Sequence, residues 1–167
     1  GKNGSTAFAY ERNFSWWTGA ETGVTVYEFS PSTGNWSSTG RTVNTSGIGF
    51  VGGAVDLAAG SYYFGGYSSS GTRFTLYRYD SSSSSISIKG WIDTSAGAGS
   101  AANGDIAFDS NGNLFVIRGS DTTTTVFSVT AENLAAGSGG KIAAAKSSGF
   151  TTNSNVNGVA FDSAGKA

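Results

Sequence analysis

The fold of this chain is decided by the stretch Asp105-Ile106-Ala107-Phe108-Asp109-Ser110-Asn111-Gly112-Asn113-Leu114-Phe115-Val116-Ile117. Residues 105–108 and 113–117 favour strands, because both runs are short, apolar and partly β-branched. Between them, Asn111-Gly112 favours a tight type I′ turn, since both residue types accept positive φ. The stretch therefore predicts a β-hairpin whose return strand is apolar enough to be buried on both faces.

The first half of this hairpin belongs to an internal repeat. An apolar step that ends in aspartate occurs three times, and the aspartates are 53 residues apart (109 − 56 and 162 − 109). An aromatic residue inside a β-branched run also occurs three times, 50 residues apart (77 − 27 and 127 − 77). These two markers are Asp56, Asp109 and Asp162, and Tyr27, Tyr77 and Phe127. Two independent markers in the same order at nearly the same period indicate repeated structural units.

Each unit offers up to four short strands, which is typical of one blade of a β-propeller. The predicted fold is all-β, with about three four-stranded antiparallel blades. One repeat domain covers residues 1–167, with approximate units 1–53, 54–106 and 107–159 and the start of a further unit at 160–167. Propellers typically have 4–8 blades. We therefore expect part of an incomplete propeller: either the natural chain continues, or two chains close one ring.

Composition narrows the possible functions. Aromatic residues make up 13% of the chain, which argues against a disordered linker despite 26 glycines. The formal net charge is −1, so no basic stripe is available for nucleic acid. No apolar run is long enough to span a membrane. The chain has no histidine and no cysteine, which removes the Ser-His-Asp triad and thiolate chemistry. We therefore predict that the chain is not an enzyme and holds no metal or cofactor.

The densest break in the repeat is the stretch 10–17, and it is our first candidate binding site. Glu11, Arg12, Trp16 and Trp17 lie between the first two predicted strands. The two tryptophans offer flat apolar surfaces for stacking on sugar rings or anchoring a protein partner. The alternative is that the two tryptophans cover the exposed end of the incomplete propeller or pack between blades.

The second candidate site is at an inner hairpin. Asp105 begins this hairpin and Arg118 follows its return strand, where propeller chains approach the central channel. The two residues offer a channel-lining pair for a small polar ligand, and the alternative is a structural ion pair. The repeated aspartates allow two interpretations. They could form a ring of cation ligands, or each could accept hydrogen bonds from backbone N–H groups across its own turn. We favour the turn role.

Two segments resemble known propeller blades. Residues 107–116 are similar to the inner hairpin of NHL- and gluconolactonase-type blades, and residues 26–36 resemble a kelch-like outer hairpin. The whole chain is similar to propeller-like regions near the N-termini of large secreted surface proteins of Gram-positive bacteria. This resemblance implies an extracellular, cell-surface binding or structural module, adhesive in role, with a protein or carbohydrate ligand. The alternatives are a lactonase- or glycosidase-like propeller hydrolase whose site lies partly in other blades, and a structural unit that self-associates.

Overall fold

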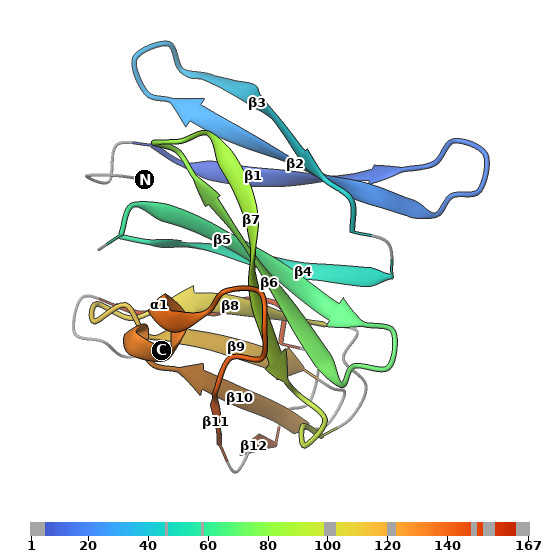
Figure 1. The fold of residues 1–167 in the computed structure, drawn as a ribbon, viewed down its shortest axis with the longest axis vertical. Coiled ribbons are helices and arrows are strands. Elements are labelled where there is room, and N and C mark those ends of the chain that lie inside the picture. The colour runs from blue at the N-terminus through green and yellow to red at the C-terminus, as the bar shows by residue number, and fades with distance from the viewer. Residues whose placement is uncertain are drawn as a thin grey trace.

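The computed structural model describes residues 6–45, 47–57, 59–98, 103–119, 123–147, 150–151 and 156–162. These residues form three antiparallel sheets, and Figure 1 shows the sheets one after another along the long axis. The first sheet contains β1 (Phe8–Phe14), β2 (Glu21–Ser30) and β3 (Asn35–Val43). The second contains β4 (Ile48–Asp56), β5 (Ser61–Ser68), β6 (Arg73–Asp80) and β7 (Ser85–Asp93). The third contains β8 (Asn103–Phe108), β9 (Leu114–Gly119), β10 (Thr123–Val129), β11 (Ala145–Lys146) and β12 (Phe150–Thr151).

The described part of the chain has a single six-residue helix, α1 (Ala131–Ala136), between β10 and β11. In each sheet the strands pair in chain order as an antiparallel meander, except that β11 and β12 both pair with β10. The prediction of an all-β chain built from antiparallel propeller-type blades is confirmed.

Two hydrophobic cores hold the three sheets together, and strand β5 contributes to both. Tyr62 and Phe64 belong to the core between the first and second sheets, whereas Tyr63 and Tyr67 belong to the core between the second and third. Successive strand residues point to opposite faces, so a strand between two sheets must be apolar at nearly every position. This is why residues 61–67 are all buried.

A bulge in β7 lets this outer strand contribute to both cores. Leu76 of β6 pairs with Gly90, but Tyr77 pairs with Ile88, so Lys89 is an extra residue in the ladder. An extra residue reverses the face to which later side chains point. Ile86 accordingly packs on the core of the first and second sheets, and Ile92 belongs to the core of the second and third.

The second and third sheets converge at their first strands, β4 and β8, which we call the inner strands. Their close approach depends on Gly52, since a Cβ atom there would collide with Asp105. The side chain of Phe108 on β8 packs on Tyr63, with ring centroids 5.2 Å apart and planes at 51°.

No helix among the described residues is long and apolar enough to cross a bilayer.

Candidate functional site

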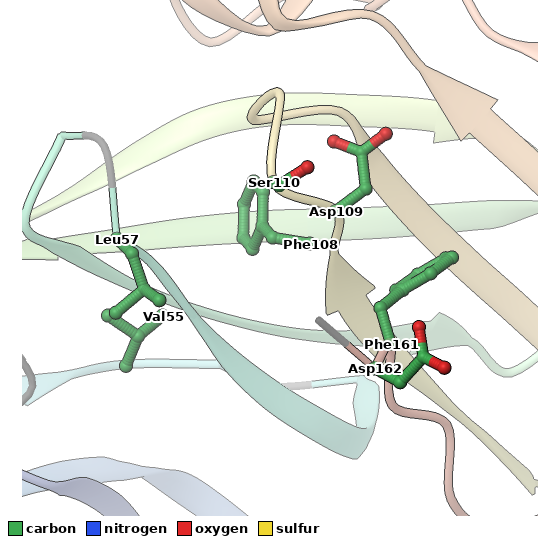
Figure 2. A pocket seen from close by; sticks show the side chains of 7 residues that line it. All are labelled: Val55, Leu57, Phe108, Asp109, Ser110, Phe161 and Asp162. Atoms are coloured by element: carbon green, nitrogen blue, oxygen red, sulfur yellow. The ribbon is translucent and has the colours of Figure 1, made fainter. Parts of the chain in front are cut away.

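A pocket of about 360 Å³ lies where the inner strands end. The ends of β4 and β8 and the segment 161–162 line it, as Figure 2 shows. The lining side chains are Val55, Leu57, Phe108, Asp109, Ser110, Phe161 and Asp162. Three of them, Val55, Phe108 and Phe161, precede the repeated aspartates in successive units. The repeat therefore brings the same position of three units to one cavity, which sequence reasoning missed although the spacing contained the signal.

Two of the repeated aspartates, Asp109 and Asp56, bind groups of their own turns. Asp109 Oδ1 accepts hydrogen bonds of 2.9 Å from the backbone N–H groups of Asn111 and Asn113, and its Oδ2 accepts one from the Asn113 side chain. Burial pushes the pKa of Asp109 up, but the bonds from Asn113, Asn111 and Gly112 outweigh it and lower the pKa. Asp56 Oδ1 accepts from Ala59 N at 3.2 Å. These bonds agree with the turn role, and within the described ranges no group of three or more acidic residues is arranged to hold a metal ion.

The predicted type I′ turn at Asn111-Gly112 is wrong. Gly112 has φ +80°. Ser84 is the only described non-glycine residue with positive φ, so Asn111 has a negative φ and cannot form a type I′ turn. The Gly112 N–H donates to the Asp109 carbonyl oxygen, and the Asp109 carboxylate accepts a hydrogen bond from the Asn111 N–H within the same turn. The side chain of Asp109 stabilises a turn in which only the glycine needs the left-handed conformation.

Asp105 joins the inner strands. Its Oδ1 accepts from Ile106 N at 2.8 Å and its Oδ2 accepts from Val159 N at 3.0 Å. The carboxylate is half-buried against Gly52, and burial raises its pKa despite the two backbone hydrogen bonds. Asp105 therefore connects β8 with the segment 156–162 while lying against β4.

Arg118, the predicted partner of Asp105, has different partners. It is 5% exposed, and its Nη1 donates to the carbonyl oxygens of Gly71 at 2.9 Å and Thr94 at 2.6 Å. These carbonyls belong to the loops at the ends of the second sheet's strands, so Arg118 fastens the third sheet to the second. Nothing in the sequence pattern indicated backbone carbonyls as its partners.

The remaining predicted site residues lie on β1 and in the turn between β1 and β2, and we call residues 14–20 the aromatic tip. Trp16 and Trp17 are 90% and 91% exposed, and Phe14 is 54% exposed. At the base of the tip, Arg12 forms an ion pair of 2.7 Å with Glu21 and lies over the Phe14 ring. Glu11 accepts a hydrogen bond of 2.7 Å from the Tyr27 hydroxyl, which raises the pKa of Tyr27.

The aromatic tip and the pocket lie at opposite ends of the sheets. Strand β1 runs into the tip, whereas β4 and β8 run toward the pocket, and Figure 1 shows these ends on opposite sides of the molecule. The structure therefore places Glu11, Arg12, Trp16 and Trp17 at the end of β1 and in the tip, apart from Asp105 and Arg118, but Glu11 and Arg12 point to opposite faces of β1.

No protein-family model and no curated protein matches this chain. Among solved structures it is similar to the β-propeller domain of the Trilobed protease from Pyrococcus furiosus, with 9% identity and a TM-score of 0.47 over 89% of this chain. It is also similar to a luciferin-regenerating enzyme, with 12% identity and a TM-score of 0.51 over 90% of this chain. The chain spans 40% and 44% of the length of these two proteins. The likeness to the luciferin-regenerating enzyme, at 12% identity, shows the propeller fold alone.

The second comparison corrects the prediction that the chain is not an enzyme. The luciferin-regenerating enzyme is an enzyme by its own description, so this kind of scaffold is compatible with catalysis. The error was to conclude from the missing histidine and cysteine that the chain has no catalytic groups. A chain without histidine and cysteine lacks the commonest general base and the thiolate nucleophile, but carboxylates, phenols and backbone N–H groups remain available for acid–base and electrostatic catalysis.

Proposed function

We propose that this chain is a carbohydrate-binding propeller module and that the aromatic tip is its recognition element. The observation that supports the proposal is the exposure of Trp16 and Trp17, at 90% and 91%. Two adjacent tryptophans with nearly their whole surface in water bury almost no apolar area in this chain, so packing within the fold does not explain them. Large apolar side chains held in water in this way are typical of binding sites.

The tip presents its rings from a hydrogen-bonded turn. Ser15 N donates to Ala20 O at 2.7 Å and Gly19 N donates to Ser15 O at 2.9 Å, which closes the loop across its base. Gly19 has φ +65°, a conformation that glycine adopts without steric cost. A turn closed by its own backbone bonds fixes the main chain from which the two rings project, so little backbone entropy is lost when a ligand stacks on them.

Carbohydrate fits the surroundings of the rings better than a protein partner does. The tip is a narrow projection beyond the sheets (Figure 1), whereas a stable protein interface needs about 800 Å² on each partner. Around the rings lie hydroxyl groups of Ser15 and Thr18 and the charged pair Arg12–Glu21, all exposed or partly exposed. Such groups hydrogen-bond sugar hydroxyls while an indole ring stacks on the sugar's C–H face.

The resemblance to secreted Gram-positive surface proteins adds a location to this proposal. A glycan-binding tip on an extracellular, cell-surface propeller suits an adhesive role. Fractionation of the producing cell, with an antibody against this chain, tests the location independently of the ligand.

The binding proposal is tested by retention on insoluble polysaccharides such as chitin, cellulose and xylan. We expect retention by at least one of them, and about a thirtyfold loss of affinity when Trp16 or Trp17 is replaced by alanine, since aromatic anchors contribute about 2 kcal/mol and each 1.4 kcal/mol is a factor of ten. Trp36→Ala is the matched control, because Trp36 is half-exposed on β3, away from the tip. Retention that survives the double replacement of Trp16 and Trp17 would contradict the proposal.

A second candidate function is hydrolysis at the inner strands, and the half-buried Asp105 favours it. A carboxyl group whose pKa is raised by burial resembles the general acids of glycoside hydrolases. If the chain is a hydrolase of this kind, neighbouring blades would contribute the other residues of the active site. Turnover of lactones or aryl glycosides that is lost in Asp105→Asn, while the far-UV circular dichroism is unchanged, would support it.

A further inference from the structure

The first sheet has a free edge at β1. Tyr27 and Tyr77 are equivalent in the repeat; Tyr77 pairs with Phe64 on β5, and Tyr27 pairs with Ala9 on β1. Strand β1 therefore occupies the place of β5. In the second sheet the inner strand β4 lies beside β5, but no described strand lies on the corresponding edge of β1. The first sheet is a blade whose inner position is unfilled by the described part of the chain.

The segment 156–162 has the sequence of an inner strand. Val159-Ala160-Phe161-Asp162 repeats Ile106-Ala107-Phe108-Asp109, the end of β8 and the residue after it, at a distance of 53 residues (162 − 109). This segment forms no ladder with any described strand. Among the described residues, one segment with an inner-strand sequence has no ladder partner, and one sheet has no inner strand.

The segment 156–162 also occupies the place of an inner strand beside β8. Phe161 packs on Phe115 with ring centroids 4.8 Å apart and planes at 49°. Phe108 packs on Tyr63 with nearly the same geometry, 5.2 Å and 51°. Phe115 and Tyr63 are equivalent, since each lies opposite the alanine of its own inner strand. The segment therefore lies beside the third sheet as β8 lies beside the second.

We propose that residues 156–162 of one copy of this chain pair with β1 of a second copy and fill its inner position. The exchange is reciprocal, so two arcs of three sheets close one ring of six blades with two-fold symmetry. Six blades fall within the 4–8 that propellers use, and added strands satisfy the backbone groups of an open sheet edge. Within one copy the two edges cannot meet, because the second sheet lies between the first and the third (Figure 1).

The side chains match in the register that the repeat dictates. An alanine lies opposite an aromatic residue in both complete blades, Ala54 with Tyr63 and Ala107 with Phe115. In the same register Ala160 of one copy lies opposite Phe8 of the other. The next facing pairs are Val159 with Ala9 and Gly158 with Tyr10, so each large residue of β1 meets a small one. This match favours a second copy over an unrelated strand, and it does not depend on what the aromatic tip binds.

The test is the mass of the 167-residue chain by light scattering after size exclusion. We expect twice the 16.9 kDa of one chain. Ala160→Glu should halve this mass, because it places a charge opposite Phe8. Ala160 is exposed within one copy, so the variant should keep its fold. The matched control Ala144→Glu changes an exposed alanine away from both edges and should leave the dimer intact.

A designed disulfide tests the register. The chain has no cysteine, so a variant with both Ala9→Cys and Val159→Cys contains only the two introduced thiols, and the single variants control for bonds between identical positions. We expect a covalent dimer under oxidising conditions, and none from either single replacement. A monomer at every concentration, an assembly that grows beyond two copies, or a dimer that persists in Ala160→Glu would each overturn the proposal.

Discussion

The carboxylate of Asp105 accepts a hydrogen bond of 3.0 Å from the backbone N–H of Val159, which lies 54 residues further along the chain. The bond spans one full repeat and connects the inner strand β8 with the segment 156–162. Gly52, the residue equivalent to Asp105 in the preceding unit, has no side chain, and the Asp105 carboxylate occupies the space beside it. The junction of β4, β8 and the segment 156–162 therefore depends on one acidic side chain and one glycine.

Replacing Asp105 with alanine should destabilise the chain by about 1–2 kcal/mol. The change leaves the N–H groups of Ile106 and Val159 without their acceptor, and an unsatisfied buried donor costs about 1–3 kcal/mol. Asp105→Asn keeps one acceptor oxygen and should cost less. Urea denaturation of the three proteins measures the order, and equal midpoints for all three would show that the bonds contribute nothing.

The stability difference between the wild-type chain and Asp105→Asn should depend on pH. Burial raises the pKa of Asp105 above its ordinary value, so the folded chain holds the proton to a higher pH than the unfolded chain does. Stability from this group is therefore full below the unfolded pKa and falls as the pH rises through the folded pKa. The wild-type chain should lose stability relative to Asp105→Asn over that window. A difference that stays constant with pH would contradict the raised pKa.

Gly52→Ala should destabilise the chain by about 1–3 kcal/mol, since the added methyl group collides with Asp105 and lies 3.0 Å from Ile106 N. Gly49→Ala is the matched control. Gly49 is on the same strand, and a Cβ there meets only Tyr67 O at 3.9 Å. Thermal unfolding of both variants gives the comparison. If Gly49→Ala is as costly as Gly52→Ala, the inner strands are not packed as described.

Trp16→Ala and Trp17→Ala should change stability by less than about 0.5 kcal/mol, as exposed positions do. Trp91→Ala should cost distinctly more. The Arg73 guanidinium lies 4.0 Å from the Trp91 ring, and the side chain is only partly exposed. Urea midpoints separate the two cases. A large loss of stability at Trp16 or Trp17 would favour the alternative in which these rings cap the arc.

Lys141→Met should raise the pKa of Asp93. The Lys141 ammonium donates to Asp93 Oδ2 at 2.8 Å, and this bond, together with the bonds from Ser95, holds the pKa of Asp93 far below its usual range. A depressed pKa contributes stability above the unfolded value, and this is lost as the pH falls through the folded value. NMR titration of the Asp93 side chain in both proteins measures the shift, and identical titration curves would disprove the assigned cause.

The sequence was enough to predict the repeat, most strands and the turn role of Asp109, because these follow from local spacing. Alternating or continuous apolar runs determine which strand faces are buried, as in 61–67, and Asp109 binds groups within four residues of itself. The division into units at 53 and 106 stays a prediction.

Other features depend on contacts between distant residues and have no local signal. The partners of Arg118 are carbonyl oxygens 47 and 24 residues away, which any residue type supplies. The bulge at Lys89 changes which face Ile92 points to, although the alternation of residues 86–91 reads as one regular strand. The pocket at Phe108 and Phe161 arises only when successive units are stacked.

The most direct test of the proposed recognition element is an NMR titration that follows the indole N–H signals. The chain has four tryptophans, so four signals report on four places. On addition of soluble fragments of a polysaccharide that retains the chain, the account predicts shifts for Trp16 and Trp17 and none for Trp36 and Trp91. The account would be contradicted if the signals of Trp16 and Trp17 did not move while those of the pocket residues Phe108 and Phe161 shifted.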